Sequence, residues 1–244
     1  MIISGASDIG RVRSSNQDSF ITGKISDSVG FVVVCDGMGG ANGGNIASEV
    51  ATNVISEHIK SAYRDNMGSN SMRYLLMSAV IAANTEIYDK AQEDETLLGM
   101  GTTVVAAIVI DNLAHIVHVG DSRAYIVSPN NIQQITHDHS VVQSMLDNGE
   151  ITAQEAKKHP NRNVITRALG VRDKVDVDYD EISLSNDDIL LICTDGLTNF
   201  VEDKKIAKII KKHKISEYPD VLIDTANNNG GGDNITVVTL SVKE

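Results

Sequence analysis

The stretch Phe31–Asn45 reads FVVVCDGMGGANGGN and joins two patterns that seldom meet. Its first half is β-branched and apolar, which is typical of a buried strand. That run ends at a lone carboxylate, Asp36, and glycines then crowd the chain as far as Gly44. A buried strand does not usually end in a lone carboxylate, so the role of Asp36 has to be explained by its surroundings. The glycines predict a backbone that must approach another group closely.

Other aspartates occur in the same setting, beside glycine at the edge of an apolar run. Asp195 follows the apolar run LLICT, Asp121 follows Gly120, and Asp233 follows a run of glycines and opens the last apolar run. Asp18 precedes an early strand. Each acid alone is typical of a turn or cap. Together they would repel one another unless a cation lay among them, which favours a shared metal site.

The donor types indicate which metal and which chemistry. Carboxylate and carbonyl oxygens suit Mg²⁺ or Mn²⁺, and no Cys or His cluster has the spacing of a zinc site. Two ions bridged by an aspartate can lower the pKa of a water between them. The acids therefore predict a metal-dependent hydrolase.

The composition and net charge narrow the class of protein and its expected partners further. The chain has 244 residues, is 41% hydrophobic and carries a net charge of −12, with a pI near 4.9. Such a charge argues against nucleic acid or an anionic membrane as the main partner. Cys35 and Cys193 lie in apolar runs and are expected to be core thiols in a reducing compartment. No basic, apolar leader and no membrane-length apolar run is visible, so we expect a cytoplasmic protein.

The order of elements predicts an α+β fold. Strand-like runs lie at residues 31–35, 102–110, 113–119, 124–127, 189–193 and 235–242, and helical periodicity at 47–61, 72–91, 203–212 and 218–227. The sequence DNLA predicts a hairpin turn between the second and third runs. Hairpin-linked strands grouped apart from helices favour antiparallel sheets flanked by helices. The polar segment His137–Leu169 is expected to be a flap, and without a linker we expect one catalytic domain over residues 1–244.

These motifs occur together in a known family. SDIGRVRSSNQD, VVVCDGMGG, GTTVVAAIV, HVGDSRAY, THDHS, NVITRALG, LLICTDGLTN and GGDNITVV stand in the order of the metal-dependent protein phosphatases of type 2C. The resemblance runs from about Ser7 to Val238 and is nearest to the compact bacterial serine/threonine phosphatases. It implies a four-layer α-β-β-α sandwich, with two antiparallel sheets between helix layers. It also implies two core Mn²⁺ or Mg²⁺ ions and a third position.

The resemblance assigns six residues to the metal ions: Asp36, Gly37, Asp195, Asp233, Asp18 and Asp121. Asp36 would bridge two ions, and the carbonyl of Gly37 would bind the second, which would account for the glycine. Asp195 and Asp233 would hold the first ion. Asp18 would act through metal-bound water, and Asp121 would complete the third position together with Asp195.

The resemblance also implies a mechanism. Arg13, rather than Arg11, would bind the phosphate, and Asn234 would orient its loop. A metal-activated hydroxide would attack phosphorus without a phosphoenzyme intermediate. The expected partners are phosphoprotein substrates and a cognate serine/threonine kinase, and we expect a monomer.

Ala41 departs from the family pattern DGMGGH, whose histidine is thought to protonate the leaving alkoxide. Three alternatives stay open: a water replaces it, His137 or His139 approaches from the flap, or activity on alkyl phosphates is reduced. Since the metal ligands and Arg13 are kept, we expect a working phosphatase. The alternative is a catalytically weakened module that binds or regulates phosphoproteins. A nucleotide-phosphate loop is disfavoured, because GMGGANGG lacks the Lys-Ser/Thr ending of a P-loop.

Overall fold

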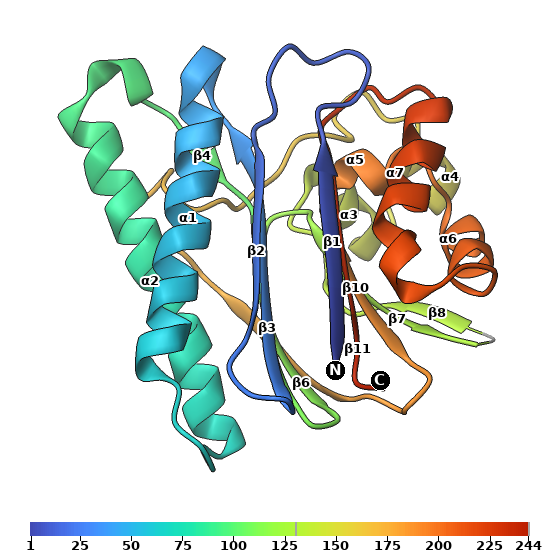
Figure 1. The fold of residues 1–244 in the computed structure, drawn as a ribbon. Helices are drawn as coiled ribbons and strands as arrows, with labels where there is room; N and C mark the ends of the chain where they lie inside the picture. Colours follow the sequence, from blue (N-terminus) through green and yellow to red (C-terminus); the bar gives the residue numbers. More distant parts are fainter. Residues whose placement is uncertain (130, 244) are drawn as a thin grey trace.

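Two antiparallel sheets lie face to face in the middle of the molecule, and helices cover their outer faces (Figure 1). The computed structural model describes residues 1–129 and 131–243, and the side chains of Ala41 and Asn42 lie outside the described part. The predicted α-β-β-α sandwich is confirmed. None of the helices in the described chain combines the length and apolar character needed to cross a membrane.

The first sheet has the order β1-β11-β10-β7-β8 and the second the order β2-β3-β5-β6-β9. The strands of the first are β1 (Ile2–Asp8), β11 (Ile235–Ser241), β10 (Ile189–Cys193), β7 (Arg123–Ser128) and β8 (Asn131–Gln134). Those of the second are β2 (Asp18–Lys24), β3 (Val29–Met38), β5 (Val104–Ile110), β6 (Leu113–Val119) and β9 (Asp178–Ser183). The short β4 (Gly101–Thr102) pairs with the end of β3.

The long helices lie on opposite sides of the sandwich. Those on the second sheet are α1 (Gly40–Ala62) and α2 (Ser69–Glu93), and those on the first are α6 (Asp203–Ile210) and α7 (Tyr218–Asn228). Shorter helices are α3 (Val141–Asp147), α4 (Ala153–Ala156) and α5 (Asp195–Thr198), with 3-10 turns η1 (Glu95–Leu97) and η2 (Ile215–Glu217).

The core has three apolar layers, and β3 shows how they arise. Phe31 and Val33 pack with α1 and α2, whereas Val32 and Val34 pack against the other sheet. Successive side chains of a strand point to opposite faces. A strand buried on both faces is therefore apolar without interruption, as the Phe31–Cys35 run is.

The strands that the sequence did not predict are β1, β8 and β9, and all three lie at sheet edges. Their burial alternates or is incomplete, and their sequences carry polar residues. The predicted hairpin is confirmed, since Ile110 pairs with Leu113 across the Asp111–Asn112 turn. Asp111 adopts a φ of 49° there, as a two-residue hairpin turn requires.

The segment His137–Leu169 carries α3 and α4 between the strands β8 and β9. Its two ends meet, because Ser140 bridges to Ile165 and the N–H of Thr166 donates to the carbonyl of His139 at 2.8 Å. Thr102 of β4 also bridges to Leu169. The flap is thus closed at its base and anchored beside the end of β3.

Candidate active site

The five acids singled out from the sequence lie where strands of both sheets begin or end. Asp18 opens β2 and pairs directly with Asp36 across the β2–β3 ladder. Asp121 follows β6, Asp195 opens α5 one residue beyond the end of β10, as Thr194 lies between them, and Asp233 precedes β11. Tight turns at these strand ends bring residues from distant parts of the sequence to one end of the sandwich.

A cavity of about 320 Å³ opens there. It is lined by seven residues that the sequence singled out: Arg13, Asp36, Gly37, Asp121, Asp195, Asp233 and Asn234. Asp18 is not part of this lining and lies behind it against Asp36. Other lining residues that the sequence did not single out include Gln17, Thr103 and the flap residue Asn163.

The clustered acids resist ionisation. Burial, reinforced by the charges of the other acids, raises the pKa of Asp36 well above its usual range. Burial likewise raises the pKa of Asp121 to about 8 and that of Asp18 to about 7. For Asp195, burial and the charge of Asp233 raise the pKa to about 6. A cation among these carboxylates would restore their charged forms.

Asp18 provides a test of whether a metal fits. Its Oδ2 accepts hydrogen bonds from the hydroxyls of Thr194 at 2.8 Å and Thr236 at 2.7 Å. Its Oδ1 is buried and has no partner among the described residues. An orphaned buried carboxylate oxygen is costly, and a cation or its water would satisfy it. The all-oxygen donors therefore fit hard divalent ions such as Mg²⁺ or Mn²⁺.

Asp36 is held by two threonines of the GTT sequence. Its N–H donates to Thr103 Oγ1 at 3.0 Å, and its carbonyl accepts from the Thr103 N–H at 2.9 Å and from Thr102 Oγ1 at 2.9 Å. Thr103 Oγ1 also shares a hydrogen bond of 2.7 Å with Ser122, the neighbour of Asp121. These threonines couple the positions of the two acids. Sequence reasoning treated them only as part of a strand.

Gly37 shows why glycine follows Asp36. A Cβ there would lie 2.0 Å from the carbonyl oxygen of Gly44 and 2.6 Å from that of Gln17. Helix α1 begins at Gly40, earlier than predicted, and its first turn packs directly on β3. This close approach requires the glycine without reference to a metal. The metal-binding role of the Gly37 carbonyl stays a prediction.

Arg13 lies in the cavity lining, whereas Arg11 does not. The guanidinium of Arg13 donates to Asp233 Oδ2 at 2.8 Å, and its side chain is 52% exposed. That hydrogen bond, with the charge of Asp233, raises the pKa of Arg13. The N–H of Arg11 instead donates to the carbonyl of Gly231 at 2.7 Å.

Asn234 ties the loop that carries Arg13 to the start of β11. Its Nδ2 donates to the carbonyls of Ile9 and Ser15, each at 3.0 Å. Its Oδ1 accepts from the N–H of Gln17 at 2.8 Å. Because both arms of the amide bind the loop backbone, Asn234 sets where the loop lies relative to Asp233.

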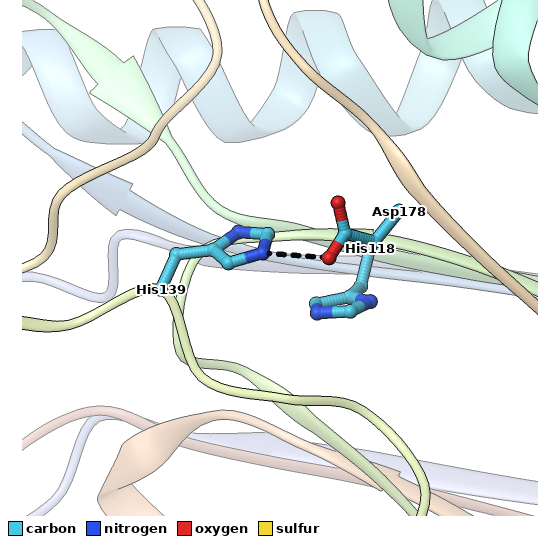
Figure 2. A group of neighbouring side chains, drawn as sticks. All are labelled: His118, His139 and Asp178. Atoms are coloured by element: carbon cyan, nitrogen blue, oxygen red, sulfur yellow. Dashed lines mark hydrogen bonds and ion pairs between the residues drawn. The ribbon is translucent and has the colours of Figure 1, made fainter. Parts of the chain in front are cut away.

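The flap histidines are engaged elsewhere. His137 is exposed and bonds Asp147 at 2.7 Å. His139 is buried, its Nδ1 accepts from the Gly120 N–H at 3.1 Å, and its Nε2 bonds Asp178 at 3.2 Å (Figure 2). Neither histidine lines the acidic cavity. The hypothesis that one of them supplies the leaving-group proton is therefore not supported, and the side chain of Ala41 lies outside the described residues.

His118, His139 and Asp178 also form a group whose possible ligand atoms lie within 4.8 Å of one another (Figure 2). Such a set could hold a metal ion by donor type. The two imidazoles, however, stack with centroids 4.7 Å apart and planes at 17°, so their in-plane lone pairs do not converge. His139 also uses both ring nitrogens in hydrogen bonds. This group therefore ties the backbone before Asp121 to β9.

An acid-lined cavity with one arginine lies at the end of the double-sheet sandwich, and its donor types could hold cations and an anionic group. A family model described as protein phosphatase 2C matches residues 5–229. The chain belongs to the protein phosphatase 2C family. The resemblance drawn from the motifs and the expected class, a protein phosphatase, are both confirmed.

Relatives and solved structures are similar over nearly their whole length. The serine/threonine phosphatase stp of Listeria monocytogenes serovar 1/2a is 40% identical, over 95% of this chain and 92% of the relative. The protein phosphatase PhpP of Streptococcus pneumoniae is 35% identical, over 100% of this chain and 98% of the relative. The structure of Stp1 from Staphylococcus aureus matches with a TM-score of 0.93 at 33% identity, over 99% of this chain and 95% of that one. The structure of the serine/threonine phosphatase PstP/Ppp from Mycobacterium tuberculosis matches with a TM-score of 0.90 at 32% identity, over 100% of this chain and 99% of that one.

Proposed function

We propose that this chain removes phosphate from phosphoserine and phosphothreonine in proteins and requires Mn²⁺ or Mg²⁺. The observation that carries the proposal is one cavity in which Arg13 lies beside Asp36, Asp121, Asp195 and Asp233. The names of the relatives, which are serine/threonine and protein phosphatases, support the substrate class.

The residues proposed to hold the ions are Asp36, the carbonyl of Gly37, Asp195, Asp233, Asp18 through water, and Asp121 at a third position. When bound, the ions would neutralise the clustered carboxylates and lower the pKa of a water. The raised pKa values of the acids support this assignment, because the cluster is unfavourable in its ionised form without a cation.

Arg13 is proposed to bind and orient the phosphate. Guanidinium offers five donors in a planar fork, and only one nitrogen of Arg13 is used on Asp233. Its side chain is half-exposed, and Asp233 is its one hydrogen-bond partner among the described residues, so its other donors are available to phosphate oxygens. Donors held at this position stabilise the charge that develops as the phosphoryl group transfers.

The chain's residues favour direct attack by water over a phosphoenzyme. Cys35 and Cys193 are fully buried, and burial raises the pKa of both thiols far above the usual range. The hydroxyl of Thr103, which does line the cavity, is engaged by Ser122 and by the Asp36 N–H. A new phosphorus–oxygen bond then forms to water while the bond to the serine or threonine oxygen breaks. With the flap histidines engaged, we propose that a solvent water protonates that leaving oxygen.

The deciding experiment measures phosphate release from phosphoserine and phosphothreonine peptides with Mn²⁺, with and without EDTA, for the wild type and Asp195→Ala. We expect release by the wild type that EDTA abolishes and that the variant largely lacks. Phosphopeptide binding without any release would favour the alternative, a phosphoprotein-binding module. That alternative is disfavoured, because the acids and Arg13 gather at one site. A cognate kinase, a monomeric state and a cytoplasmic location stay predictions.

A further inference from the structure

A second cavity, of about 280 Å³, adjoins the acidic one, and the charged residues of its largely apolar lining are mainly basic. Arg167, Arg172 and Lys174 line it, and Asp176 is the one carboxylate among its lining residues. Met38 and Ile165 line both cavities, so the two share a wall. In a chain with a net charge of −12, this local excess of cations runs against the overall charge.

The backbone that carries these cations is held from beneath by one buried residue of α2. Asn84 is 1% exposed, and its Nδ2 donates to the carbonyls of Arg172 and Asp173 at 3.1 and 3.2 Å. Its Oδ1 accepts from the N–H of Gly170 at 2.9 Å. A buried amide that satisfies three backbone groups sets the loop's position. The basic wall is therefore built into the fold.

Arg167 is fixed by its own contacts. Its Nη1 donates to Asp178 Oδ1 at 3.0 Å and lies 3.2 Å from His139 Nε2. The group drawn in Figure 2 thus anchors Arg167 at the rim of the basic cavity.

Arg172 and Lys174 differ from Arg167 in having free charges. Both are exposed, and no described residue forms a hydrogen bond or ion pair with either side chain. An anion in the cavity could therefore pair with these two cations without breaking an existing ion pair.

We propose that the basic cavity lined by Arg167, Arg172 and Lys174 binds a second anionic side chain of the phosphoprotein substrate, a carboxylate or a further phosphate. This rests on the proposed function, since the scissile phosphate must occupy the acidic cavity. Because the two cavities share a wall and an extended peptide advances about 3.3 Å per residue, the second anion is expected within a few residues of the scissile phosphate. The basic cavity offsets the repulsion that the acidic protein exerts on such peptides.

The test compares phosphoserine peptides that carry asparagine, aspartate or a second phosphoserine at positions from four residues before to four after the scissile group. For the wild type with Mn²⁺, we expect kcat/KM to be about three- to tenfold higher for the aspartate peptide than for the asparagine peptide in the favourable register. The doubly phosphorylated peptide should gain more, and the difference should lie mainly in KM.

The perturbation is the double variant Arg172→Gln, Lys174→Gln. We expect its ratio of kcat/KM between aspartate and asparagine peptides to fall toward one. The matched control, Lys211→Gln with Lys212→Gln, removes the same charge at the exposed end of α6 and should keep the wild-type ratio. The charge-reversed pair Arg172→Glu, Lys174→Glu should prefer peptides with lysine at the same position. Melting temperatures report whether each variant folds.

The outcomes separate the two proposals. If no peptide releases phosphate, the proposed function fails. If phosphate is released without preference for a second anion, or if the double variant keeps the wild-type ratio, the basic cavity has no role in substrate binding. A preference that the control pair abolishes equally would mean that overall charge, and not this cavity, selects the substrate.

Discussion

Replacing Asp18 with asparagine should make the metal-free protein more stable at pH 8. The Asp18 carboxylate has one buried oxygen without a partner, and burial raises its pKa from 3.8 to about 7. A shift of that size corresponds to about 4 kcal/mol, and relaxation within the coupled cluster reduces it, so we expect about 2–4 kcal/mol. Asparagine keeps an oxygen to accept from Thr194 and Thr236 while removing the charge.

The pH dependence has a definite sign. The folded pKa of Asp18 lies above its unfolded value, so its contribution to stability is complete below about pH 4 and is lost as pH rises through about 7. The gain from Asp18→Asn should therefore rise from pH 5 to pH 8, and it would approach zero only below about pH 4. All other titratable groups are shared by the wild type and Asp18→Asn. The difference between their unfolding free energies therefore reports on the carboxyl of Asp18.

The assay is urea unfolding in EDTA from pH 5 to pH 8.5, repeated at pH 8 with Mn²⁺. Metal should stabilise the wild type more than the variant, since it relieves a repulsion that the variant lacks. The control is Asp27→Asn, an exposed loop acid, which should show no such pH dependence. A variant that is less stable than the wild type at pH 8, or a gain that does not change with pH, would refute the reasoning.

Three further predictions concern residues of the active site and its surroundings. Ala41→His should raise turnover of phosphoserine peptides, by as much as about 10²-fold, with little gain on aryl phosphates, since only the alkoxide needs an acid; equal gains on both substrates would contradict this. Arg13→Ala should lower kcat/KM about tenfold to hundredfold, with Mn²⁺ binding by calorimetry retained, because a charge-assisted contact to phosphate is lost. An unchanged kcat/KM would exclude that contact. Thr103→Val should lower the free energy of unfolding by about 1–2 kcal/mol, because the Asp36 N–H and the Ser122 hydroxyl lose their hydrogen-bond partner. Urea unfolding measures this loss, and equal midpoints for the variant and the wild type would show that these hydrogen bonds are dispensable.

The core strands could be predicted from the sequence, whereas the sheet edges could not. Strand β3 is buried on both faces, so its apolar run is continuous and easily recognised. Strand β9, with the sequence DYDEIS, is only partly buried and lies at an edge. Pairing with β6 gives it strand structure that its own composition does not favour. Tertiary context outweighs local propensity at such edges.

The sequence by itself determined the chemistry of the donors: aspartates beside glycines, one arginine at a fixed spacing, and no cluster of cysteines or histidines at the spacing of a zinc site. Only the tertiary structure decided how these groups act on one another. The burial that raises the pKa of Asp36, the orphaned oxygen of Asp18 and the engagement of His139 depend on residues far apart in the chain. The same holds for the basic cavity, since Asn84 holds a loop 86 or more residues away. Residue type sets which bonds a side chain can form, but burial and distance, which belong to the fold, set which of them form and what they contribute.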